Sequence, residues 1–175
     1  RLDRDDDMIM TGKRHEILGK WAVGFDDEGR IQAADVEMAM RCGCSKDLSD
    51  AISDRAMFHL DNSYYLDQVR ITCQRMRTDT VSNTAFRGFG GPQGMMIGER
   101  MIEDVARAVG KDTLDVRKAN FYGGEGRNTT PYHMRVEDFV LPEMIEELEA
   151  SSNYRARRKA ITEFNKNSPI IKRGL

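Results

Sequence analysis

Hydrophobic and polar positions alternate along three stretches in the first half of the chain. Residues 20–25 and 30–41 alternate on either side of a turn signal at 26–29, which predicts two strands joined by a hairpin. Residues 68–77 alternate and include β-branched side chains, so they predict a third strand. The short apolar run at 7–11 predicts a further strand near the start.

Stretches with the periodicity of a helix lie between the second and third predicted strands and over most of the second half of the chain. Capping residues precede a predicted helix at 48–60, and a stronger apolar stripe over 93–109 ends at Gly110. Further helices are predicted at 112–120, 141–148 and 153–165, and the Gly- and Thr-rich residues 123–135 predict a surface loop. Strands followed by helices, with one strand–helix–strand passage, predict an α+β fold in which a mixed sheet packs against helices in two layers.

Composition narrows the class of protein without identifying it. A length of 175 residues predicts a single domain over 1–175, and a net charge of −2 does not favour a nucleic-acid partner. No apolar run is long enough to span a membrane. Three cysteines without a CxxC pair predict reduced thiols and a cytoplasmic location, and a metal site at Cys42 and Cys44 is disfavoured. The chain starts without Met and stops abruptly, so we expect an excised segment of a larger subunit.

The most informative run is 86–93, Phe-Arg-Gly-Phe-Gly-Gly-Pro-Gln, directly before the strongest predicted helix. Glycine permits positive φ and close approach of a ligand, and a helix start leaves N–H groups that can face an anion. Arg87, between Phe86 and Phe89, is expected to turn away from solvent, and Phe89 between two glycines can stack on a planar ligand. A loop-stapling role for Arg87 and a plain core role for Phe89 stay open as alternatives.

Arg55 is the second candidate, because its helical neighbours three and four positions away are mostly apolar or small. This pattern predicts that Arg55 shares the inward stripe with Leu48 and Ile52. A charge there is costly unless it is paired or faces a ligand. Two interpretations follow: a structural ion pair with an acid such as Asp54, or a clamp for an anion or carbonyl oxygen.

No residue of this chain is a convincing general base or nucleophile. The three histidines, His15, His59 and His133, lack a metal-binding spacing, and His59 is expected to make a hydrogen bond in the core. No Ser/His/Asp or Cys/His set is visible. If the chain belongs to an enzyme, it contributes binding and electrostatics, and proton transfer lies elsewhere.

Four runs of residues, met in order along the chain, resemble a known family. They are 4–15, 54–59, 82–93 and 172–175. The run Asn-Thr-Ala-Phe-Arg-Gly-Phe-Gly-Gly-Pro-Gln is far more specific than a generic glycine pattern. On these residues the chain resembles the molybdenum-binding large subunit of the xanthine dehydrogenase family over essentially its whole length.

The resemblance implies an enzyme that hydroxylates purines such as xanthine and hypoxanthine, with water as the oxygen source. A molybdenum–pterin cofactor would receive the electrons, and 2Fe–2S clusters and FAD on other domains would pass them to NAD. It implies that Arg87 contacts the molybdenum centre, with Gly88 beside it at the cofactor. It also implies that Phe89 meets the purine, and that Arg55 faces a purine oxygen and stabilises negative charge in the transition state.

The family's glutamate base and other walls of its site lie outside this chain. The resemblance therefore implies that the segment alone is inactive, that other domains or subunits complete the site, and that complete enzymes form a dimer. Two alternatives stay open. One is an aldehyde or heterocycle oxidase segment, which Arg55 argues against because those relatives lack this arginine. The other is a non-catalytic assembly or binding module with the same fold.

Overall fold

The computed structural model describes residues 1–124 and 126–175, in two compact units, Arg1–Val136 and Glu137–Leu175. Residue 125 of the predicted loop 123–135 lies outside the described residues. The expectation of a single domain over 1–175 stays a prediction. Among the residues described, no helix has both the length and the apolar character needed to cross a bilayer.

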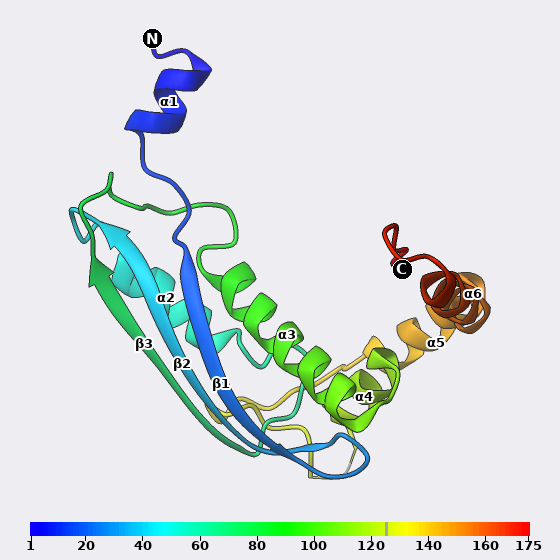
Figure 1. The fold of residues 1–175 in the computed structure, drawn as a ribbon. Coiled ribbons are helices and arrows are strands. Elements are labelled where there is room, and N and C mark those ends of the chain that lie inside the picture. Colours follow the sequence, from blue (N-terminus) through cyan, green and yellow to red (C-terminus); the bar gives the residue numbers. More distant parts are fainter. Residues whose placement is uncertain (125) are drawn as a thin grey trace. The chain divides into compact units, whose positions relative to one another are not determined.

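A three-stranded sheet forms the base of the first unit (Figure 1). Strand β2 (Ile31–Gly43) lies in the middle, antiparallel to β1 (Ile17–Phe25) and parallel to β3 (Gln68–Arg77). A parallel pair needs a crossover connection, and helix α2 (Ser49–Phe58) provides it. The three predicted strands and the mixed sheet are confirmed.

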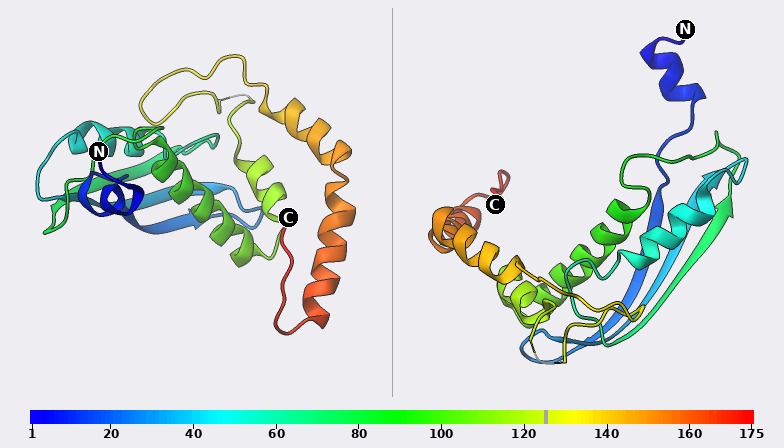
Figure 2. Two further views of the ribbon diagram at one scale, coloured as in Figure 1. Left: turned by 90° about the horizontal axis from the view of Figure 1, so that it is seen from above. Right: turned by 180° about the vertical axis from the view of Figure 1, so that it is seen from behind.

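Two helices cover one face of this sheet, as the views in Figure 2 show. Helix α2 packs on β3, and α3 (Gly91–Val109) packs on β1. Alternate residues of β2 point under the helices, so Val36, Met38 and Met40 are fully or almost fully buried. Helix α4 (Thr113–Asn120) packs on α3. The two-layer α+β prediction is therefore confirmed, and Gly110 ends α3 in the left-handed conformation as expected.

Helix α3 approaches α2 through glycines spaced one helical turn apart. A Cβ atom built at Gly94 would lie 2.0 Å from the carbonyl oxygen of Ala56, closer than real contacts allow. The same conflict recurs one turn earlier and one turn later, at 2.1 Å each, for Gly90 against Ile52 and Gly98 against Leu60. These glycines let the two backbones touch, and this contact fixes α2 beside the start of α3.

The strand predicted at 7–11 is wrong, because helix α1 (Arg4–Met10) occupies this region. The side chain of Asp3 caps the helix by accepting the Asp6 N–H at 3.0 Å. The three acidic residues at 5–7 lie in the first turn, where the helix dipole favours negative charge. These N-terminal signals outweigh the short apolar run that follows, and no residue of α1 is buried.

The second unit contains the two remaining predicted helices, α5 (Leu141–Ser151) and α6 (Tyr154–Asn167). Neither helix buries a residue, and apolar side chains of α5 such as Met144 and Leu148 are largely exposed. The amphipathic pattern therefore identified both helices, although most of the apolar face of α5 remains uncovered.

Candidate functional site

The run 86–93 forms a tight turn that leads into α3. Gly88 and Gly90 have φ values of 94° and 97°, and Phe89 between them has φ of 49°. A Cβ atom at Gly88 would lie 2.5 Å from the ring of Pro92, so only glycine fits there. The N–H groups of Phe89 and Gly91 donate to the carbonyls of Phe86 and Gly88 at 2.8 and 2.9 Å. Part of the predicted set of free N–H donors is thus used inside the turn.

The two aromatic rings of this turn point in different directions. Phe89 is half-buried and packs against a buried cluster of Met40, Cys42 and Ile52. Phe86, in contrast, is 58% exposed.

Arg87 is exposed, in contrast to its expected turn away from solvent. In the described part of the chain its guanidinium has no hydrogen bond and no acidic partner, so it does not staple the loop. The main-chain carbonyl of Arg87 is held instead, because it accepts a hydrogen bond from Arg14 Nη2 at 2.6 Å. The backbone at Arg87 is therefore anchored while its charged side chain is left available.

Arg55 is also exposed, so its predicted place on a buried stripe is wrong. Ile52 and Ala56 form the inner face of α2 against the glycines of α3, and this packing turns Arg55 toward the edge. The alternative ion pair is not formed either, since Asp54 pairs with Arg75. Arg55 Nε lies 3.8 Å from the Cβ position of Gly91, which places the guanidinium beside the first residue of α3.

Two runs some 70 residues apart meet under this turn. Asn83 is buried, and its side-chain Nδ2 donates to the carbonyls of Lys13 and Arg14 at 3.2 and 3.0 Å. Gln93 Nε2 donates to the carbonyl of His15 at 3.1 Å. The structure thus joins the runs 4–15 and 82–93, and local patterns in the sequence gave no signal of this contact.

His15 connects the same layer to the start of α2. It is buried, and its Nε2 shares a hydrogen bond with Ser49 Oγ at 2.8 Å. Burial lowers the pKa of His15, and the carboxylate of Asp47 acts in the opposite direction. The His15 side chain therefore holds the start of α2, while its carbonyl holds the side chain of Gln93 at the start of α3.

Several buried polar atoms around the turn have no hydrogen-bond partner in the described chain. They are Arg14 Nη1, His59 Nδ1, Asn83 Oδ1 and Gln93 Oε1. The hydrogen bond expected for His59 in the core is therefore not made by Nδ1. Buried polar atoms are normally paired, and unpaired ones near one surface indicate that a further group belongs there. Together with these donors and acceptors, the free guanidinium groups of Arg55 and Arg87 suit a polar ligand that carries negative charge.

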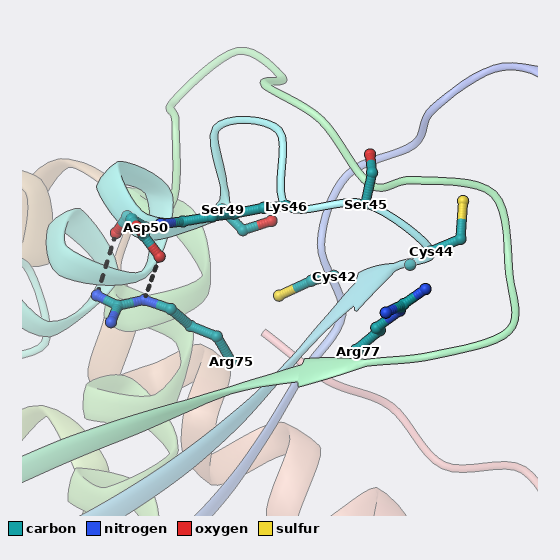
Figure 3. Close-up of a pocket in the computed structure, with 9 residues that line it drawn as sticks. Cys42, Cys44, Ser45, Lys46, Ser49, Asp50, Arg75 and Arg77 are labelled. Carbon is teal, nitrogen blue, oxygen red and sulfur yellow. Dashed lines mark hydrogen bonds and ion pairs between the residues drawn. The ribbon is translucent and has the colours of Figure 1, made fainter.

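A separate cavity, lined by no residue of this turn, lies at the ends of β2 and β3 (Figure 3). It has a volume of about 330 Å³, and its lining includes Cys42, Cys44, Lys46, Asp50, Arg75 and Arg77. Lys46 and Arg75 are already paired with Asp50. No three His, Cys, Asp or Glu side chains of the described chain gather as metal ligands. The turn at 86–93 with Arg55 therefore stays the candidate site.

A family match assigns this fold and its glycine-rich turn to a class of cofactor-binding domains. The chain matches the molybdopterin cofactor-binding domain over residues 1–121, and it belongs to that family. Its relatives include the xanthine dehydrogenase of Drosophila subobscura, 45% identical, and the xanthine dehydrogenase/oxidase of Gallus gallus, 47% identical, each over 174 residues. Each alignment covers 99% of this chain and 13% of the relative. The resemblance stated from the sequence is confirmed.

Solved structures agree with this family. The aldehyde oxidoreductase from Desulfovibrio desulfuricans superimposes with a TM-score of 0.77 and 26% identity, covering 87% of this chain and 16% of that one. Quinoline 2-oxidoreductase from Pseudomonas putida 86 gives a TM-score of 0.79 over 95% of this chain and 22% of that one. At 21% identity, the second likeness shows the fold alone.

Proposed function

We propose that this chain supplies one wall of the molybdenum and substrate site in an enzyme that hydroxylates purines such as xanthine and hypoxanthine. The observation that carries the proposal is Arg55, a cation without an acidic partner in the described chain, set beside Gly91 at the start of α3. Arg87 lies in the turn that immediately precedes this helix. The relatives named xanthine dehydrogenase support purines over aldehydes as the substrate class.

The residues of the turn fit a molybdenum–pterin cofactor. Arg87 and Gly88 would hold it, because a free guanidinium beside a glycine without a Cβ offers charge and close backbone approach. The unpaired Gln93 Oε1 offers an acceptor at the same turn. The cofactor, when bound, supplies the oxidation of the purine carbon.

Arg55 and Phe89 are the substrate residues of the proposal. Arg55 is permanently charged, so it can stabilise negative charge that develops on a purine oxygen without any proton transfer. Phe89 is held in place by the buried cluster beneath it, and its remaining exposed part can border a flat purine ring. The chain orients the substrate and stabilises charge, while the base that activates water belongs to another part of the enzyme.

The remaining assignments concern the complete protein and are part of the same proposal. FAD and 2Fe–2S clusters on other domains carry the electrons away, and the enzyme works as a dimer in the cytoplasm. The chain spans only 13% of the relatives named above, which agrees with a site completed by other segments.

The test uses the complete enzyme purified with molybdenum. We expect hydroxylation of xanthine in isotopically labelled water to place the label in the product. Turnover of aldehydes without turnover of xanthine would favour the aldehyde oxidase alternative. A complete protein that holds no molybdenum and oxidises neither substrate would instead indicate a non-catalytic binding module.

A further inference from the structure

Arg14 makes two contacts that converge on the turn at 86–89. Its Nη2 donates to the carbonyl of Arg87 at 2.6 Å, and its guanidinium carbon lies 4.4 Å from the centre of the Phe86 ring. A hydrogen bond from a charged donor is among the stronger ones in proteins, and stacking on an aromatic face adds to it. One side chain therefore holds the residues on both sides of the Phe86–Arg87 peptide.

The backbone that follows leaves little room for any other arrangement. Gly88 has a φ of 94°, and a Cβ atom added at this position would lie 2.5 Å from the Pro92 ring and 3.9 Å from Arg14 Nη1. The Gly91 N–H then closes the turn onto the carbonyl of Gly88 at 2.9 Å. The main chain at Arg87 thus lies between its hydrogen bond to Arg14 and the closed turn at the start of α3.

The base of Arg14 is fixed as well. Its own carbonyl accepts the hydrogen bond from buried Asn83, and the preceding carbonyl of Lys13 accepts the N–H of Thr84 at 3.0 Å. At the end of the Arg14 side chain a guanidinium is needed, because this planar group can lie on the Phe86 ring and at the same time donate, in its own plane, to the Arg87 carbonyl. An ammonium group lacks that geometry.

We infer that Arg14 is a positioning residue, which locks the Phe86–Gly88 turn so that the Arg87 guanidinium is presented to the cofactor in one orientation. The inference rests on the proposed function for the role of Arg87, but the locking itself concerns only this chain. Arg14 acts through Arg87 and has no assigned contact with substrate.

The first test measures amide hydrogen exchange in the complete protein prepared without molybdenum. Arg14→Met removes both contacts, so the Phe89 and Gly91 amides should exchange about 10-fold faster or more, as expected for a lost charged hydrogen bond. Lys13→Met is the matched control. Among the residues that the structure describes, the Lys13 amine donates only to Asp7 and Thr11 near α1, so its removal should leave exchange in the turn unchanged.

Faster exchange of the β2 amides in Arg14→Met would show that this variant disturbs folding. In that case Arg14→Lys, which keeps the charge, serves as the test. We expect Arg14→Lys to keep β2 protected and to lose protection at Phe89 and Gly91. Protection of the turn equal to wild type in Arg14→Lys would overturn the inference. Equal effects of Arg14→Met and Lys13→Met on the turn would overturn it too.

The second test measures xanthine turnover per bound molybdenum in the complete enzyme. Misplacing a group at a reaction centre by about 1 Å can cost up to about 100-fold in rate, and we expect Arg14→Met to lower kcat by about 10-fold with little change in KM. A purely structural role would reduce molybdenum content and leave kcat per molybdenum unchanged, which contradicts the inference. If wild type fails to oxidise purines, the proposed function fails, and the exchange measurement still decides whether Arg14 locks the turn.

Discussion

Replacing Gly94 with alanine would place a methyl group inside the contact between α2 and α3. The new Cβ would lie 2.0 Å from the Ala56 carbonyl oxygen, whereas ordinary contacts begin at 3.4 Å, so the backbones must separate by up to 1.4 Å (3.4 minus 2.0). Because the obstacle is backbone, no rotamer change relieves it. Overpacking against rigid backbone belongs at the upper end of its usual range, about 3 kcal/mol, and alanine recovers about 1 kcal/mol of helix propensity, so we expect a net loss of about 2 kcal/mol.

Urea-induced unfolding measures this loss as a shift in the midpoint at constant slope. Gly24→Ala is the matched control, because the nearest atom to a Cβ there is 4.0 Å away, and we expect its free energy of unfolding to change by less than about 0.5 kcal/mol. Arg55 precedes Ala56 on α2, so Gly94→Ala should also displace Arg55 and slow xanthine turnover in the complete enzyme. A Gly94→Ala protein as stable as wild type would refute the close helix contact.

Two further predictions concern His15 and the metal. Burial lowers the pKa of His15 in the folded chain, so the unfolded chain binds a proton at a higher pH than the folded chain does. The contribution of neutral His15 to the free energy of unfolding should therefore be fully present above about pH 6.5 and fall as the pH drops through that value. His15→Gln should flatten this dependence in unfolding experiments from pH 7 to pH 5, and an unchanged slope would assign it to other groups. The 175-residue chain by itself should contain no molybdenum by metal analysis, because in the proposed function other segments complete the site; stoichiometric metal would show that these residues suffice.

The sequence predicted the strands and helices well where one periodicity dominated. Residues 68–77 form β3 with the predicted bounds, because alternation and β-branched residues agree there. Helix α3 begins at Gly91, two residues before the predicted start, since Gly90 serves as the N-cap. Region 7–11 was misjudged because the capping Asp3 lies outside the apolar run that suggested a strand.

The side-chain environment of the site was harder to predict. Periodicity shows which residues share a helix face, but not which neighbour covers that face, so Arg55 was placed on the buried side. The glycines of α3 that displace it belong to a helix some 40 residues later, and their spacing acquires meaning only with α2 in place. The contact between Arg14 and Arg87 spans 73 residues and leaves no local pattern.

Turnover of xanthine and of an aldehyde by the complete enzyme tests most directly whether Arg55 stabilises charge on a purine oxygen. Removal of a preorganised charge-stabilising donor costs about 3–4 kcal/mol of barrier, so Arg55→Ala should lower kcat/KM for xanthine by about 100- to 1000-fold. An aldehyde has no distal oxygen for Arg55 to meet, so its kcat/KM should change far less. Equal losses on xanthine and on the aldehyde would contradict the account.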